Sequence, residues 1–212
     1  MNIIEISGVT KYFGKVKVLD SISLAFEKGK IHGIMGSNGA GKSTLIKLIT
    51  NSLAVDSGSI KVFHHNVSKE FHKIKGRIGL VPQEVVLIEE LSAFENVKFF
   101  ASLYKLKGNQ LKEQVKEALC VTNLWEERHK KVSQYSGGMK RRLNIACAIM
   151  HKPELLIMDE PTVGIDSESK EMIFTAMQEL NNKGTTILFI SHIEHELQEI
   201  CHHIVDLDYS GI

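Results

Sequence analysis

The sequence is poor in cysteine, proline and tryptophan and has almost no surplus of either charge. Its cysteines are an odd number, at spacings that match neither a zinc module nor a redox pair, which favours a reducing compartment: Cys120, Cys147 and Cys201. The formal net charge over 212 residues is only +1, so the chain lacks the basic surplus of most nucleic-acid-binding domains, and we expect no nucleic-acid partner. The 43% hydrophobic content excludes a disordered chain.

Long apolar runs are also absent. No window of about 18 consecutive apolar residues occurs, so no membrane-spanning helix is predicted. The first residues, MNIIEISGVTKYFGK, lack the basic start, apolar stretch and small-residue cleavage site of a secretory signal. If the protein acts at a membrane, we therefore expect another chain to hold it there.

Short apolar runs alternate along the chain with longer segments whose apolar residues have helical spacing. This pattern predicts an α/β fold with a mainly parallel sheet, since strands covered by helices on both faces are apolar throughout. The clearest runs are Ile31–Met35, residues 155–158 and Thr186–Ile190, each followed by a polar or glycine-containing turn. Residues 166–183 predict a helix, with apolar residues on one face and Gly184 just past its end. Functional groups in such sheets gather at the carboxyl ends of the strands.

The two remaining parts of the chain follow other patterns. Residues 3–9 and 16–29 alternate apolar and polar residues, which predicts an antiparallel edge subdomain. Between residues 84 and 133 the spacing is helical, carried by Leu91, Phe94, Val97, Leu103, Leu111, Val115, Ala118 and Leu119. We predict one domain over residues 1–212, with the core and its antiparallel edge at 1–83 and 134–212 and a helical lobe inserted at 84–133.

A glycine-rich segment follows the apolar run that ends at Met35. It fits the phosphate-loop pattern G-x-x-x-x-G-K-[ST] and comprises Gly36, Ser37, Asn38, Gly39, Ala40, Gly41, Lys42 and Ser43, with Thr44 opening a helical stretch. Glycines let backbone N–H groups and the helix N-terminus face a polyphosphate. Lys42 would reach the outer phosphates and Ser43 would place its hydroxyl on Mg²⁺. A plain glycine-rich turn is the alternative.

Two acids end the apolar run at residues 155–158. Asp159 would reach the carboxyl end of a buried strand beside the phosphate loop, where it can hold Mg²⁺. Glu160 is then placed to polarise an attacking water as a general base. The alternative is that both acids only begin a solvated turn.

The order of these and later motifs resembles the nucleotide-binding domain of ATP-binding cassette (ABC) transporters. The motifs are LVPQ ending at Gln83, YSGGM at residues 135–139, DEP at 159–161, GID at 164–166 and Ser191-His192. The resemblance extends over essentially the whole chain. It implies a P-loop NTPase core with an antiparallel edge and a helical lobe, and ATP with Mg²⁺ as cofactors.

The resemblance also implies roles for individual residues. Phe13, beside Tyr12, would stack on adenine, although an aromatic buried in the edge sheet is the alternative. Gln83 would contact Mg²⁺ and the attacking water. His192 would hydrogen-bond the γ-phosphate and orient that water, and Asp166 would couple two sites across a dimer.

The segment YSGGM resembles the signature that closes on the nucleotide of a second subunit. Ser136, Gly137 and Gly138 would offer a hydroxyl and N–H groups to that phosphate, while Tyr135 and Met139 depart from the usual Leu-Ser-Gly-Gly-Gln. The basic triplet 140–142 is interpreted as a solvated face rather than a nucleic-acid patch. The histidine pairs at 64–65 and 202–203 are interpreted as surface residues, because no ligand set completes a metal site.

Together these features predict the ATP-hydrolysing subunit of an ABC transporter, with YSGGM and PTVGID resembling the exporter branch. We expect head-to-tail pairing with a second nucleotide-binding subunit, either a copy or a sibling chain, and integral membrane permease subunits that hold the chain at the cytoplasmic face of the cell membrane. The alternatives are a soluble ABC-type ATPase acting on DNA or ribosomes, whose relatives carry coiled-coil insertions or two cassettes, and a small-molecule kinase, which would lack YSGGM.

Overall fold

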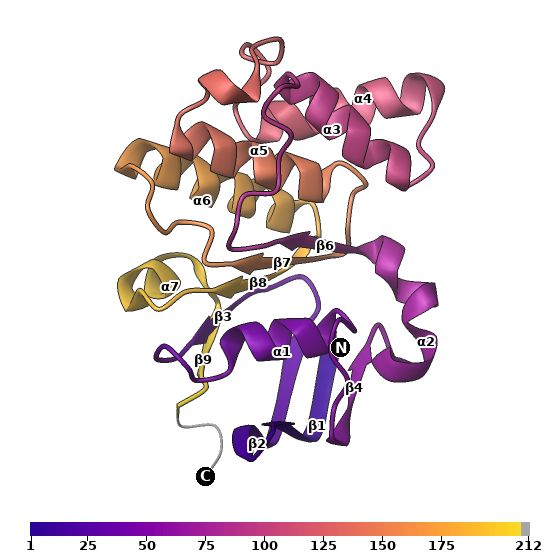
Figure 1. The fold of residues 1–212 in the computed structure, drawn as a ribbon, viewed down its shortest axis with the longest axis vertical. Helices are drawn as coiled ribbons and strands as arrows, with labels where there is room; N and C mark the ends of the chain where they lie inside the picture. Colours follow the sequence, from indigo (N-terminus) through magenta and orange to yellow (C-terminus); the bar gives the residue numbers. More distant parts are fainter. Residues whose placement is uncertain (209–212) are drawn as a thin grey trace.

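Two sheets with different strand directions form the framework of the computed structural model, which describes residues 1–208 (Figure 1). The smaller sheet is antiparallel in the order β2-β1-β4-β5. Its strands are β1 (Asn2–Phe13), β2 (Val16–Glu27), β4 (Ser57–Val62) and β5 (His65–Asn66). Strand β1 pairs antiparallel with both β2 and β4, and its apolar residues Ile4 and Ile6 are buried while Ser7 is exposed, so the predicted antiparallel edge is confirmed.

The larger sheet is parallel throughout, in the order β6-β7-β8-β3-β9. It contains β6 (Ile78–Val81), β7 (Leu155–Asp159), β8 (Thr186–Ile190), β3 (Ile31–Met35) and β9 (His203–Asp206). The three apolar runs of the sequence are β3, β7 and β8 at its centre. Leu155 and Ile157 face one core, whereas Leu156 and Met158 face the other. Burial on both faces is why the run is unbroken.

Helices cover both faces of the parallel sheet. Helix α1 (Lys42–Ile49) lies between the two sheets, and α5 (Gly137–Ile149) and α6 (Ser167–Asn182) cover the opposite face (Figure 1). Four short elements complete the described secondary structure outside the helical lobe and at its end, namely the helices α2 (Val67–Ile74) and α7 (Glu194–Ile200) and the 3₁₀ turns η1 (Lys75–Arg77) and η2 (Val132–Gln134). The predicted helix at residues 166–183 is α6, with Asp166 as its N-cap.

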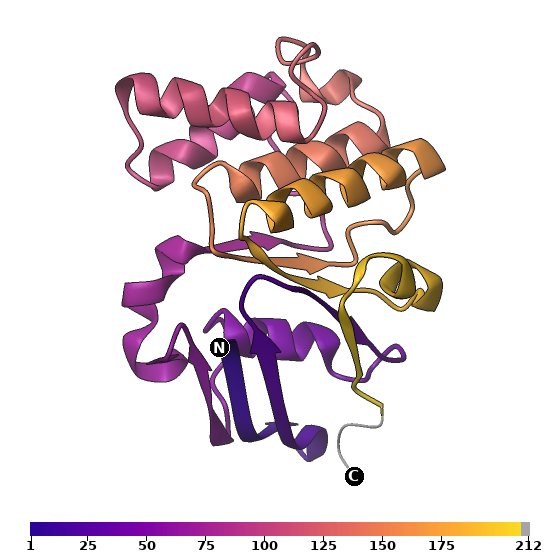
Figure 2. The same ribbon diagram turned by 180° about the vertical axis from the view of Figure 1, so that it is seen from behind.

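The helical lobe lies beyond α5 and α6, at the end of the molecule far from the antiparallel sheet (Figure 2). It contains α3 (Ala93–Leu103) and α4 (Gly108–Val121), and α3 begins with a capping box between Ser92 and Glu95. Leu91 precedes α3 and is half-buried, and Leu103 is 66% exposed, so these two residues of the predicted apolar face are not among the described core residues.

The basic triplet at the start of α5 is not a solvated face, contrary to the sequence interpretation. Arg141 and Arg142 are buried. Arg141 donates to the Pro82 carbonyl at 3.0 Å, and Arg142 donates to the carbonyls of Thr122 and Asn123 at the end of α4. Because α5 is covered on nearly all sides, these guanidinium groups tie it to the helical lobe and to the loop that carries Gln83.

Candidate nucleotide-binding site

The phosphate loop joins β3 to α1 and depends on glycine at two points. Gly39 and Gly41 have φ angles of 94° and 92°, a left-handed conformation that disfavours other residues. A Cβ atom on Gly41 would also lie 2.6 Å from Cδ2 of Leu19. The loop can therefore wrap closely around a ligand.

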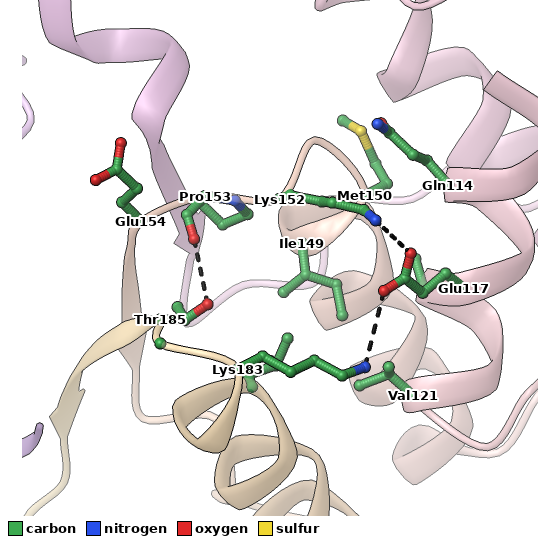
Figure 3. Close-up of a pocket in the computed structure, with 13 residues that line it drawn as sticks. Gln114, Glu117, Val121, Ile149, Met150, Lys152, Pro153, Glu154, Lys183 and Thr185 are labelled. Atoms are coloured by element: carbon green, nitrogen blue, oxygen red, sulfur yellow. Dashed lines mark hydrogen bonds and ion pairs between the residues drawn. The ribbon is translucent and has the colours of Figure 1, made fainter. Parts of the chain in front are cut away.

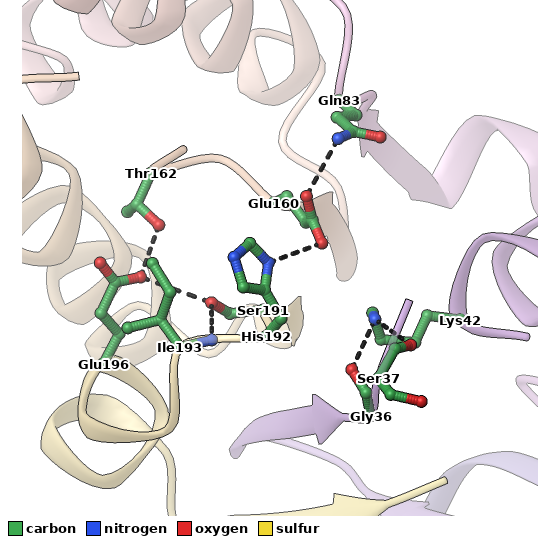
Figure 4. Close-up of polar contacts among 10 residues, drawn as sticks. All are labelled: Gly36, Ser37, Lys42, Gln83, Glu160, Thr162, Ser191, His192, Ile193 and Glu196. Atoms are coloured by element: carbon green, nitrogen blue, oxygen red, sulfur yellow. Dashed lines mark hydrogen bonds and ion pairs between the residues drawn. The ribbon is translucent and has the colours of Figure 1, made fainter. Parts of the chain in front are cut away.

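Lys42 begins α1 and is buried. Its Nζ donates to the carbonyls of Gly36 at 2.7 Å and Ser37 at 2.9 Å, inside the curve of the loop (Figure 4). A pocket of about 420 Å³ opens beside the loop. Its lining includes Phe13, Val18, Asn38, Gly39, Gly41, Lys42, Ser43, Thr44, Gln83 and Glu160. The structure thus brings part of the predicted phosphate loop together with Gln83 and Glu160 in one cavity, whereas Gly36, Ser37 and His192 line another pocket that shares Asn38 with it.

Glu160 is contacted by both other residues expected to handle the attacking water. Gln83 Nε2 donates to Glu160 Oε2 at 3.0 Å, and His192 Nδ1 lies 3.0 Å from Oε1 (Figure 4). Glu160 is only 8% exposed and has a φ angle of 47°, in the left-handed region that a non-glycine residue adopts at an energetic cost. The simple solvated turn considered from sequence is therefore wrong for this carboxylate.

Asp159 ends β7 and offers an oxygen ligand beside the phosphate loop. Burial, together with the charge of Glu160, raises the pKa of Asp159, while Ser43 and Lys42 act in the opposite direction. This half-buried carboxylate beside a second acid would be stabilised in its charged form by a nearby cation. The oxygens of Ser43, Asp159 and Gln83 are ligands that Mg²⁺ prefers, so this donor set fits the expected ion.

The aromatic residues at the end of β1 are exposed. Phe13 is 49% exposed and lines the pocket, and Tyr12 is 42% exposed. The alternative of an aromatic buried in the edge sheet is therefore wrong for Phe13. Its ring is available to stack on a base.

The signature residues do not reach their own phosphate loop. Ser136 is the N-cap of α5 and accepts from the Met139 N–H at 3.2 Å. Ser136 and Gly137 are exposed, whereas Gly138 is buried against Ser169 and Asp166. Ser136, Gly137, Gly138 and Asp166 are all absent from the lining of the pocket beside Lys42.

The two departures from the usual signature have a packing explanation. Tyr135 is buried, and its hydroxyl donates to the Glu127 carbonyl at 2.8 Å. Met139 packs partly against the core that includes the helical lobe. Both side chains therefore secure the start of α5 within this chain.

Another pocket, of about 310 Å³, lies between α4 and the segments that follow α5 and α6 (Figure 3). Glu117 on α4 pairs there with Lys152 at 2.6 Å and with Lys183 at 3.7 Å. Glu154 and Thr185 precede β7 and β8, so this pocket is at the amino ends of the parallel strands. It is on the opposite edge of the sheet from the phosphate loop.

Two residues that sequence reasoning missed contact the site or its loops. Asp208 accepts from the Ser37 N–H at 2.7 Å and from its hydroxyl at 2.9 Å. Asp208 follows β9, the strand that pairs with β3, and an acid at the end of that last strand was the only sequence feature that could have indicated this contact. Glu196 is buried in α7 behind His192, and only its location after Ser191-His192 pointed to it.

The histidine pairs take no part in the site. His64, His202 and His203 are exposed and His65 is half-buried, as expected for surface residues. Within residues 1–208 no group of three or more His, Cys, Asp or Glu side chains is placed to hold a metal ion.

A glycine-rich loop that holds a lysine at a helix start, with an acid pair at the end of another buried strand of the same parallel sheet, defines a P-loop nucleotide-binding protein. The model of the ABC transporter family matches residues 19–163. The chain belongs to this family and carries its ATP-binding cassette, which confirms the resemblance and the fold class predicted from sequence.

The similarity to known proteins of this family covers nearly the whole chain. The linearmycin resistance ATP-binding protein LnrL of Bacillus subtilis is 42% identical over 205 residues, covering 97% of this chain and 66% of the relative. The bacitracin transport ATP-binding protein BcrA of Enterococcus faecalis is 38% identical, covering 93% and 64%. A dimeric cassette in a post-hydrolysis state with ADP and Pi has a TM-score of 0.84 at 27% identity, covering 96% and 93%. The chain spans slightly less than two thirds of the curated relatives named here.

Proposed function

We propose that this chain is the ATP-hydrolysing subunit of an ABC exporter. The observation that carries the proposal is Glu160, a buried carboxylate at the end of β7 whose two oxygens meet Gln83 and His192. A carboxylate at this point of a P-loop core is suited to accept the proton of a water that attacks the γ-phosphate.

Each residue around Glu160 has a chemically distinct task. Lys42 leaves its two carbonyl partners to bind the β- and γ-phosphates. Mg²⁺, held by Ser43, Asp159 and Gln83, would supply positive charge that offsets the charge on the phosphate oxygens. His192 orients the water and the γ-phosphate, and Phe13 stacks on adenine. These positions create a preorganised electrostatic site.

The proposed active unit is a head-to-tail pair of chains. Ser136 and Gly137 are exposed and remote from their own pocket lining, while the N–H groups at the start of α5 are suited to bind an anion. A two-fold pair would present them to the phosphates of the partner, with Asp166 near the shared interface. ATP would hold the pair together, and hydrolysis would release it.

Membrane permease subunits are the proposed second partners. None of the helices within residues 1–208 combines the length and hydropathy needed to cross a membrane. Apolar side chains are exposed after Gln83 and on the helical lobe, namely Val85, Val86, Phe99, Leu103 and Tyr104. This surface is suited to the cytoplasmic loops of a permease, which would hold the chain at the cytoplasmic face of the membrane and receive the movement of the lobe. The names of similar proteins, which refer to linearmycin resistance, bacitracin transport and Nod factor export, support coupling of ATP hydrolysis to transport out of the cell.

Two measurements test this function. Phosphate release from Mg·ATP should proceed without an acceptor, and its rate per chain should rise with protein concentration because two chains complete each site. A kinase would instead require an acceptor. Co-purification from detergent-extracted membranes of the native host should recover a polytopic membrane protein in stoichiometric amount. Recovery of ribosomes or DNA in its place would contradict the exporter assignment.

A further inference from the structure

Glu196 is a buried carboxylate for which the proposed chemistry of phosphate transfer has no direct use. It lies in the first turn of α7 and is only 2% exposed. Its Oε2 accepts from the Thr162 hydroxyl at 2.6 Å and from the Ser191 hydroxyl at 3.5 Å (Figure 4). Its Oε1 faces Nζ of Lys170 on α6 at 3.6 Å. Burying a carboxylate is costly, and these partners compensate for the lost solvation.

The partners of Glu196 belong to the two loops that carry Glu160 and His192. Thr162 follows Glu160 by two residues, and Ser191 immediately precedes His192. The Ser191 hydroxyl also accepts from the Ile193 N–H at 3.0 Å, so the turn is held on both sides of His192. One carboxylate thus connects the loop of Glu160 to the loop of His192.

The loop of Glu160 needs such an attachment. The left-handed backbone of Glu160 costs on the order of 1 kcal/mol or more and persists only when its surroundings hold it. On one side the Glu160 N–H donates to the Ile190 carbonyl at 3.0 Å. On the other side the buried Thr162 is held by Glu196.

We propose that Glu196 is a positioning residue for hydrolysis, which holds Thr162 and Ser191 so that the Glu160 carboxylate and the His192 imidazole meet. It acts through these side chains and does not touch the reacting atoms. The inference rests on the proposed ATP hydrolysis at Glu160.

The first test separates turnover from nucleotide binding. In Glu196→Ala and in Thr162→Val, kcat for phosphate release should fall about 10- to 100-fold, the loss expected from a displacement of about 1 Å at a catalytic group. The Kd of a fluorescent ATP analogue with Mg²⁺ should stay within about twofold, since the phosphate loop is untouched. Glu199→Gln, on an exposed position of the same helix, is the matched control. Unchanged kcat in Glu196→Ala, with an active parent chain, would overturn the inference, whereas an inactive parent would overturn the proposed function.

A double-mutant cycle excludes a merely structural role. If Glu196 acts through His192, then Glu196→Ala should change the residual kcat of His192→Ala by less than about twofold. An equal fold-loss in both backgrounds would show that Glu196 acts independently of His192 and would contradict the proposed positioning of the Glu160–His192 contact.

A measurement without turnover tests the geometry itself. In ¹⁵N-labelled protein, the side-chain nitrogen signals of His192, assigned by their loss in His192→Ala, should move in Glu196→Ala toward their positions in Glu160→Ala, which removes the contact directly. Signals that stay at their parent positions in Glu196→Ala would overturn the positioning role even if kcat falls.

Discussion

Nδ1 of His192 lies 3.0 Å from Oε1 of Glu160, although the two residues are 32 positions apart in the chain. Gln83 Nε2 occupies the other carboxylate oxygen at 3.0 Å. Both oxygens of Glu160 therefore have a protein partner. Each oxygen keeps a second lone pair, which can accept a hydrogen bond from an attacking water while these contacts hold the carboxylate in place.

Removing the charge of Glu160 should separate binding from hydrolysis. Glu160→Gln retains the shape of the side chain but has no basic carboxylate, so phosphate release should fall by at least about 100-fold. Nucleotide binding should persist, and an ATP-bound dimer should accumulate. Size-exclusion chromatography with light scattering in saturating Mg·ATP measures this, with Glu171→Gln at an exposed position of α6 as control. A variant that remains monomeric under these conditions would count against the head-to-tail mechanism.

Lys42 should contribute to nucleotide binding directly. Its Nζ is held by two carbonyls of the phosphate loop, at the place where the outer phosphates are expected. Lys42→Ala should weaken binding of a fluorescent ATP analogue by roughly 10- to 100-fold, the value of one or two charge-assisted hydrogen bonds. Lys47→Ala, at an exposed position of the same helix, should bind as the parent does. Equal affinities of the two variants for the ATP analogue would contradict the assignment of Lys42 to phosphate binding.

Gly138 is required by packing, and Gly137 is not. A Cβ on Gly138 would clash with the Ser169 hydroxyl and lie 2.6 Å from Ser169 Cβ and 2.9 Å from Asp166 Oδ2, whereas nothing lies within 4 Å of a Cβ on Gly137. Gly138→Ala should lower the free energy of unfolding by about 1–3 kcal/mol, because α5 and α6 must move apart. Gly137→Ala should leave it nearly unchanged. Urea unfolding of both variants decides the point, and equal stabilities would contradict the close packing.

His151 should make stability depend on pH. Burial lowers its pKa to about 4, although its hydrogen bond with the Ile78 carbonyl acts in the opposite direction. The ring stacks on Tyr104 at 3.9 Å, and Nδ1 is buried with no hydrogen-bond partner among the described residues. An unfolded histidine titrates near ~6.5. Between these values the unfolded chain binds more protons, so the free energy of unfolding should fall as pH decreases.

The expected loss for His151 is roughly 2 kcal/mol between pH 7 and pH 5. His151→Gln should remove this part of the pH dependence, while His72→Gln, at an exposed position, should keep it. Urea unfolding at both pH values measures the difference. A parent profile that is flat over this window would contradict the burial of a neutral imidazole.

Local patterns were sufficient to predict much of the nucleotide site. The glycine-rich loop was predicted because its backbone conformation and anion binding depend on neighbouring residues, as the φ angles of Gly39 and Gly41 illustrate. Strand β7 was predicted because a strand buried on both faces is apolar throughout, and its last residue must then be Asp159 at the edge beside the loop.

Tertiary packing decided what these patterns left open. The sequence favoured a solvated face for the basic residues Arg141 and Arg142. The elements packed around α5 instead bury both side chains, and backbone carbonyls accept their hydrogen bonds. Glu196 belongs to none of the motifs found in the sequence, but the approach of two loops makes it their common hydrogen-bond acceptor. The sequence by itself determined which chemical groups this protein has and which short segment is expected to bind phosphate. The tertiary structure decided which distant groups meet, because those contacts depend on how helices and loops pack rather than on neighbours in the chain.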